Sequence, residues 1–273
     1  MERLDADHQH GDQILAGAPE VITDDAELSG IIALTSTYKA MALGYLIQTF
    51  EQVPITAGNN AEFSSREQVL TEVLTLLDNA LTQITNTPPS TGFNNNVMLA
   101  GFDLENTIYA MQARYNLLAG NYGAAIDAAN NVDPTATSVF SFDGSTSRNP
   151  IFDAVASGDE GQEYAPRDNF GSPLTEAGDE RLGFFLISED VSSTPNDLPI
   201  DGLSGFYTTP GSSIPVYLPG EMNLIRAEAY VRTQEPGLAV NEIDADSHER
   251  SLGRSLWSRA NLQAIPGDWM MIR

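Results

Sequence analysis

The chain has 273 residues, of which 38 are acidic and 13 are basic, so its formal net charge is -25. A surface this acidic repels phosphate backbones and anionic membranes, which argues against nucleic acid as a partner. The hydrophobic content of 41% is sufficient for a buried core. Cysteine is absent, which excludes disulfides, a thiolate nucleophile and cysteine-type zinc sites.

The basic residues comprise a single lysine, Lys39, and twelve arginines. This bias has two explanations that the sequence leaves open. One is adaptation to high salt, where the self-repulsion of a carboxylate-rich surface is screened. The other is drift in the composition of the source lineage. No stretch reaches the roughly 18 uninterrupted apolar residues of a spanning helix, and the amino terminus has no apolar signal core.

The amino-terminal part of the chain predicts one irregular segment and one helix. Residues 1–28 show no sustained periodicity, so we expect a mostly irregular lead-in. The apolar spacing that includes Tyr38 and Tyr45 predicts a helix over residues 31–50. Pro54 disfavours helix at the residue before it, so the chain turns there.

A second helix is the most strongly patterned element of the chain. Ser64 is followed three residues later by Glu67, which is a capping-box pattern and predicts the start of the helix. An apolar stripe runs from Val69 to Ile84. The two prolines that begin at Pro88 cannot continue a helix, so they predict its end.

Two further helices, over residues 104–119 and 122–131, are separated by the short turn "GNYG". Two antiparallel helices joined in this way form an αα-hairpin, the unit from which helical repeats are stacked. We therefore predict a helical-repeat part over residues 31–134. Residues 138–214 are dense in Gly, Ser, Asp and Pro with scattered aromatics, and they predict a loop-rich part in which "RLGFFLI" forms a short strand or helix.

The stretch "YLPGEMNLIRAEAYVR", residues 217–232, predicts a closing helix, because Pro and Gly precede an uninterrupted helical run. Its apolar positions form two adjacent stripes, so we expect more than one neighbour to cover it. The stripes are Leu224, Ala227 and Val231, and Met222, Ile225 and Ala229. Residues 233–273 are predicted as a tail of uncertain structure, because "QEPG" interrupts the helical pattern. The predicted whole is one mainly α domain over residues 1–273.

Several of these pieces resemble one family. "ALTSTYKAMALGYLIQTFEQVPIT", "SSREQVLTEVLTLLDNALTQI", "YAMQARYNLLAGNYGAAIDAANNV", "DERLGFFL" and "YLPGEMNLIRAEAYVR" are similar, in this order, to elements of the SusD-like nutrient-binding outer-membrane lipoproteins of Bacteroidota-type bacteria. The resemblance implies tetratricopeptide-like helical hairpins with a loop-rich irregular subdomain. It also implies that charged residues of the closing helix have structural roles.

The resemblance further implies a function. Such a protein binds oligosaccharides or similar nutrients at the cell surface, on the outer membrane, and delivers them to a SusC-like TonB-dependent transporter. It has no catalytic residues, cofactor or metal. The chain departs from the family pattern in its shorter length, in the degraded "NEIDADSHER" and in the missing lipidated cysteine, so we expect a shortened copy.

Sugar binding without catalysis requires flat apolar faces with amide or guanidinium donors on loops. Six residues of the loop-rich part fit this chemistry, and each of them could instead pack the loop onto the helices. These candidate ligand-binding residues are Tyr164, Arg167, Asn169, Phe170, Phe206 and Tyr207.

Three other interpretations remain open. His8 and His10 could share a metal ion in an extended segment, although a polar terminus is the simpler explanation. The acidic cluster Asp159, Glu160 and Glu163 could supply the two carboxylates of a glycan hydrolase, although a solvated turn is favoured. A helical-repeat scaffold that binds a protein partner is the main alternative to nutrient binding.

Overall fold

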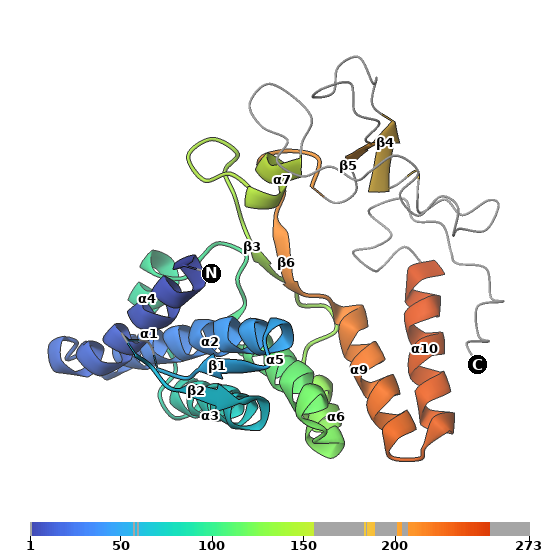
Figure 1. The fold of residues 1–273 in the computed structure, drawn as a ribbon, viewed down its shortest axis with the longest axis horizontal. Helices are drawn as coiled ribbons and strands as arrows, with labels where there is room; N and C mark the ends of the chain where they lie inside the picture. Colours follow the sequence, from blue (N-terminus) through green and yellow to red (C-terminus); the bar gives the residue numbers. More distant parts are fainter. Residues whose placement is uncertain are drawn as a thin grey trace. The chain divides into compact units, whose positions relative to one another are not determined.

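The computed structural model describes residues 2–56, 58, 60–155, 183, 185–188, 201–203 and 207–251. The chain forms two compact units, and we describe each by itself. The helical unit comprises Met1–Ser138 and Val216–Asp244, and the loop unit comprises Val139–Pro215 and Ala245–Arg273. The predicted mainly α fold is confirmed, because helices dominate the described residues and every strand is short (Figure 1).

The helices are α1 (Glu2–Val21), α2 (Asp25–Thr49), α3 (Arg66–Asn86), α4 (Thr91–Asn96), α5 (Leu104–Ala119), α6 (Tyr122–Asn131), α7 (Pro150–Val155), α9 (Pro219–Arg232) and α10 (Pro236–Ser251). The strands are β1 (Gln52–Pro54), β2 (Phe63–Ser65), β3 (Ser138–Phe140), β4 (Leu186–Ser188), β5 (Asp201–Leu203) and β6 (Ile214–Tyr217). They form three two-stranded sheets, β1 with β2, β3 with β6, and β4 with β5. The first and the last of these pairs are antiparallel.

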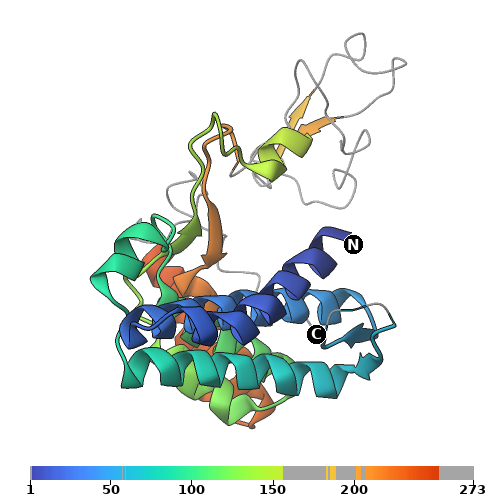
Figure 2. The ribbon, with the colours of Figure 1, turned by 90° about the vertical axis from the view of Figure 1, so that its left-hand side faces the viewer.

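Helix α2 lies at the centre of the helical unit, between α1 and α3, and Figure 2 shows the three helices side by side. By length and composition α2 could cross a membrane, since its most apolar window has a mean hydropathy of 1.3. In the structure 56% of that window is buried. Packing within the helical unit therefore accounts for the apolar character of α2.

Two glycines of α2 let aromatic rings approach its backbone. A Cβ atom added at Gly44 would overlap the ring of Tyr115 on α5. A Cβ atom at Gly30 would lie 2.6 Å from the ring of Phe93 on α4. Both rings are buried, with Phe93 fully enclosed. The absence of a side chain at these two positions sets how closely α4 and α5 pack against α2.

Helix α3 forms as predicted, but its capping residues are one position later. The side chain of Ser65, not Ser64, accepts from the backbone N–H of Gln68, and the Gln68 side chain accepts from the Ser65 N–H. Both serines belong to strand β2, and Ser65, the last residue of that strand, directly precedes α3 and therefore occupies the cap position. The predicted stripe is buried from Val69 to Ala80.

The αα-hairpin of α5 and α6 is confirmed, with the predicted bounds for both helices. Asp103 caps α5, and its carboxylate accepts from the backbone N–H of Asn106 at 3.0 Å. Gly120 ends α5 in the left-handed conformation with φ of 81°, which a residue without Cβ adopts at no steric cost. The turn between the two helices therefore depends on this glycine.

Helix α9 packs on α5 and α6, so the prediction of more than one neighbour is confirmed. Its buried residues are Met222, Ile225, Ala227 and Ala229. The expectation that Leu224 and Val231 are covered too is wrong. Within the described part of the chain, Leu224 is 49% exposed and Val231 is 57% exposed. The neighbouring helices cover a narrower arc than the apolar pattern suggests.

Two segments predicted as irregular or uncertain are helices. Residues 2–21 form α1 rather than an irregular lead-in, and α1 packs on α2. Lys39 of α2 is buried and reaches Asp12 of α1 at 2.6 Å, an ion pair that the sequence pattern does not reveal. The segment "QEPG" is the turn between α9 and α10, and its proline and glycine begin α10 rather than end the helical structure.

Charged residues of α9 form ion pairs with other helices. This agrees with the structural role that the resemblance implies. The Arg114 guanidinium of α5 donates to both carboxylate oxygens of Glu221, at 2.6 and 2.8 Å. Burial alone would lower the pKa of Arg114, but the hydrogen bonds and charge of Glu221 outweigh it and raise the pKa. Arg226 pairs with Glu242 of α10 at 2.8 Å and donates to the Ala129 carbonyl at the end of α6.

In the loop unit, side chains of Asp143 and Asn149 form hydrogen bonds with backbone groups. The Asp143 carboxylate accepts from the backbone N–H groups of Ser145 and Ser147, which lowers its pKa. Asn149 is fully buried, donates to the Ser212 carbonyl at 2.7 Å and caps α7. The end of the predicted short element in "RLGFFLI" overlaps strand β4, which runs from Leu186 to Ser188.

Candidate functional site

Most of the residues predicted to bind ligand lie outside the described part of the chain. This applies to Tyr164, Arg167, Asn169, Phe170 and Phe206, and to the acidic cluster Asp159, Glu160 and Glu163. Tyr207 is described. It is half-buried in the loop unit, and burial raises the pKa of its phenol.

The proposed histidine pair rests on an extended segment, and the structure has a helix there. His8 and His10 both belong to α1. The extended backbone on which that interpretation depends is therefore absent at these two residues. Among the described residues, no group of three or more His, Cys, Asp or Glu side chains is arranged to hold a metal.

The helical unit contains a pocket where α3 ends and α5 begins, with a volume of about 690 Å³. Its walls come from the end of α3, the double proline, α4, the connection that follows α4 and the first turn of α5. The lining residues are Ile84, Thr85, Pro88, Pro89, Asn94, Met98, Leu99, Ala100, Gly101, Phe102, Asp103, Leu104 and Glu105. The sequence pattern marks both ends of the pocket as helix boundaries but does not predict a pocket between them.

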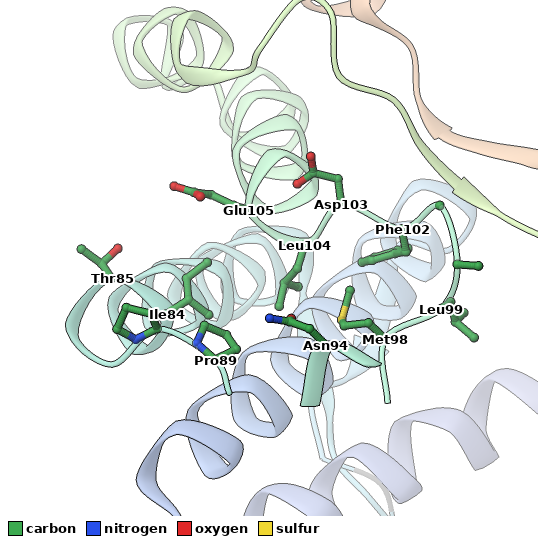
Figure 3. A pocket seen from close by; sticks show the side chains of 13 residues that line it. Ile84, Thr85, Pro89, Asn94, Met98, Leu99, Phe102, Asp103, Leu104 and Glu105 are labelled. Atoms are coloured by element: carbon green, nitrogen blue, oxygen red, sulfur yellow. The ribbon is translucent and has the colours of Figure 1, made fainter. Parts of the chain in front are cut away.

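The apolar wall of the pocket is partly open to solvent. Figure 3 shows Asn94 and Leu104 pointing toward one another, with Pro89 on one side and Met98 on the other. Leu99 is 50% exposed at the edge. At the base, the buried ring of Phe102 packs edge-on against Tyr38 of α2 with ring centroids 5.4 Å apart. This contact fixes the connection between α4 and α5 against the helical core.

Four polar side chains line the pocket. One of them caps a helix, and the other three form no hydrogen bond or ion pair that stabilises the described part of the fold. Both carboxylate oxygens of Asp103 accept from Asn106, so this side chain is committed to capping α5. Thr85, Asn94 and Glu105 are exposed, and their side chains make no hydrogen bond or ion pair with other described residues. The thirteen described residues that line the pocket include no lysine, arginine or histidine.

The sequence signals at this pocket were recognised only as helix punctuation. Pro88 predicts the end of one helix, and Leu104 the start of another. That these two ends lie together follows from the antiparallel packing of α3 and α5, which a local pattern does not determine. The pocket was therefore missed.

Comparisons with solved structures establish what this architecture is. No family model and no curated protein matches the chain by sequence. A SusD-like carbohydrate-binding protein from Bacteroides fragilis superposes with a TM-score of 0.64 at 12% identity, over 89% of this chain and 63% of the other. The chain has the SusD-like fold.

Two further structures give the same result. A laminarin-binding SusD-like protein matches with a TM-score of 0.57 at 15% identity, over 90% of this chain and 72% of its own. A SusD superfamily protein from Bacteroides thetaiotaomicron matches with a TM-score of 0.60 at 16% identity, over 89% of this chain and 65% of the other. The chain thus spans about two thirds of the length of these SusD-like structures, with most of its own residues matched.

Proposed function

We propose that this protein binds oligosaccharides or similar nutrients at the cell surface and delivers them to a SusC-like TonB-dependent transporter. The observation that carries the proposal is the SusD-like fold over about nine tenths of the chain, shared with proteins described as carbohydrate-binding and laminarin-binding. Identities of 12% and 15% leave the ligand of this chain to be established by binding.

The proposed ligand residues remain those of the loop-rich part. An aromatic ring supplies a flat apolar face for a sugar ring, and amide and guanidinium groups donate to its hydroxyls. Tyr164, Arg167, Asn169, Phe170, Phe206 and Tyr207 combine these groups within one segment of the sequence.

Isothermal titration of the full chain against neutral and acidic oligosaccharides, laminarin fragments among them, tests sugar binding. We expect at least one oligosaccharide to bind, and Tyr164→Ala with Phe170→Ala to weaken that binding without lowering the melting temperature. Absence of binding across the panel would overturn the proposal.

Delivery to a transporter requires a complex. We expect a gene for a SusC-like protein beside the gene for this chain, and we expect the two products to purify together when they are co-expressed. A co-expressed transporter that never retains the chain would remove delivery from the proposal and leave sugar binding to be decided by titration.

A second candidate function is favoured by one observation on α9 and α10. Five large apolar side chains of these helices are exposed among the described residues: Leu224, Val231, Leu238, Val240 and Ile243. Exposed apolar side chains that form one contiguous patch mark a surface that contacts another protein, whereas single scattered ones are ordinary. If Leu224→Asp abolishes a complex with a purified partner and leaves sugar titration unchanged, this surface binds protein.

Catalysis is not part of the proposal. Hydrolysis would require two carboxylates at a fixed separation, and the acidic cluster named above is the candidate for them. Incubation of purified protein with a glycan that it binds is expected to yield no products. Turnover that disappears in Glu163→Gln would instead show a glycan hydrolase.

A further inference from the structure

We propose that the pocket between α3, α4 and α5 is a subsite for sugars without acidic groups, and that it discriminates against uronate or sulfated sugars. The inference rests on the proposed oligosaccharide binding and adds to it a place in the helical unit and a substrate class. Four properties of the pocket carry it.

The first property is size. Small-molecule sites in proteins enclose about 300–1,000 Å³. The pocket has a volume of about 690 Å³, all of it lined by one stretch of chain that runs from Ile84 to Glu105. It therefore accommodates a ligand larger than a water cluster or a simple ion.

The second property is the apolar wall. Pro88 and Pro89 stand side by side at the end of α3, and Leu99 lies exposed at the edge of the pocket. Sugar rings carry C–H groups on their faces, and these pack against apolar surface such as a pyrrolidine ring or a leucine side chain. Proline has no backbone N–H, so these two residues contribute no backbone donor to the wall.

The third property is a set of hydrogen-bonding side chains. Glu105 is acceptor-only when ionised, and Asn94 and Thr85 each add an oxygen acceptor together with N–H or O–H donors. The last carbonyl groups of a helix lack intrahelical partners, and the end of α3 forms one side of the pocket. Hydroxyl groups of a sugar are the complementary donors.

The fourth property is the sign of the charge. The described lining contains the carboxylates of Asp103 and Glu105 and no basic side chain. The end of α3 adds a partial negative charge and the start of α5 a partial positive one, so the two helix ends offset each other and the carboxylates decide the sign. An acidic sugar would bring a like charge into this site, which costs affinity.

The experiment is titration of the full chain with neutral hexasaccharides of glucose, xylose or mannose, and with a hexamer of galacturonate as the acidic probe. We expect a neutral hexasaccharide to bind at least tenfold more tightly than the acidic hexamer. Equal or tighter binding of the acidic hexamer would overturn the proposal.

Two pairs of matched variants locate the effect. Asn94→Ala is expected to weaken neutral binding about fivefold, as loss of one hydrogen bond does, whereas Asn95→Ala on the same short helix is expected to have little effect. Glu105→Lys is expected to strengthen binding of the acidic hexamer at least about fivefold. Glu67→Lys changes the total charge by the same amount and also lies in a first helical turn. It is expected to change the affinity for the acidic hexamer little.

The outcomes separate this inference from the proposed function. If a neutral hexasaccharide binds but Asn94→Ala behaves like Asn95→Ala, the pocket is not the subsite, and oligosaccharide binding stands. If none of the hexasaccharides binds, both the subsite and the proposed function are wrong.

Discussion

Ile225 and Leu224 are neighbours on α9 with opposite environments. Ile225 is 5% exposed and Leu224 is 49% exposed. An aspartate in place of Ile225 would place an unpaired charge between α9 and the helices that cover it, at a cost of several kcal/mol against a total stability of ~5–15. We expect Ile225→Asp to unfold or aggregate the protein, as measured by circular dichroism and thermal melting.

The matched control is Leu224→Asp, which makes the same type of substitution one residue earlier. It is expected to change the free energy of unfolding by less than about 1 kcal/mol, as exposed substitutions do. Arg232→Ala removes an exposed ion pair with Glu228 and should be tolerated as well. Equal melting of the two aspartate variants would show that the burial of α9 is wrongly assigned.

Gly44 gives a second test of packing at a single residue. Alanine is intrinsically better than glycine inside a helix by about 1 kcal/mol, so propensity alone predicts stabilisation. At Gly44 the new Cβ would overlap the ring of Tyr115, and overpacking typically costs about 1–3 kcal/mol. We therefore expect Gly44→Ala to lower the urea midpoint.

Gly17→Ala in α1 is the control, because a Cβ there meets nothing within 4 Å. It is expected to leave the urea midpoint unchanged or to raise it, with a gain of up to about 1 kcal/mol in the free energy of unfolding. If both alanine variants stabilise the protein, α2 and α5 do not pack as closely as the structure shows.

A local sequence pattern identified the role of a residue only where that role did not depend on other parts of the chain. The sequence contains two overlapping capping boxes, from Ser64 and from Ser65, and only the second coincides with the residue that directly precedes α3. The apolar positions of α9 were recognised, but which of them are covered depends on where α5 and α6 lie. The buried pair of Lys39 with Asp12 joins two helices and has no local signature.

At the scale of elements, the contact of α5 with α9 depends on the Arg114 and Glu221 pair. The two side chains are 27% and 30% exposed, so solvent screens the pair only in part. Glu221→Gln leaves the guanidinium without its charged partner, and we expect a loss of about 1–2 kcal/mol in urea unfolding.

Glu228→Gln on the same helix is the comparison, because its partner Arg232 is 56% exposed. Exposed pairs contribute about 0–1 kcal/mol, so this variant should be nearly neutral. A larger loss for Glu228→Gln than for Glu221→Gln would contradict the assigned role of the α5–α9 pair.

The predictability of elements followed the strength of their own pattern. The helices α5 and α6 combine a periodic apolar face with a glycine turn, and their bounds were predicted. Helix α1 has few apolar residues and contains Gly11, Gly17 and Pro19, all of which favour an interruption by local rules. It forms on the surface of α2, and α10 likewise begins at the proline and glycine that suggested an end.

At the scale of the molecule, the order of several weak motifs predicted the SusD-like fold, which the superpositions then showed. The pocket could not be predicted in this way, because its residues meet only when α3 and α5 pack. The loop-rich ligand residues other than Tyr207 lie outside the described chain, and ligand binding by all six stays a prediction.

Charge is a property of the whole chain. The 38 acidic residues outnumber the 13 basic ones, so repulsive pairs dominate any compact arrangement. Among the described residues, ion pairs engage Lys39, Arg114, Arg148, Arg226 and Arg232, each with one carboxylate. Folding brings the acidic residues closer together and is opposed by their repulsion.

We therefore expect stability to rise with sodium chloride. The screening length is about 30 Å at 0.01 M ionic strength and about 3 Å at 1 M, so most of the repulsion acts in the first condition and little in the second. The melting temperature should increase by at least about 2–4 °C, which corresponds to ~1 kcal/mol for a chain of this size. Sulfate should raise it further, because it also strengthens apolar burial. A melting temperature that stays flat or falls across the sodium chloride series would show that bound cations or arginine pairs already compensate the acidic groups, and it would remove the reason to infer a salt-adapted source.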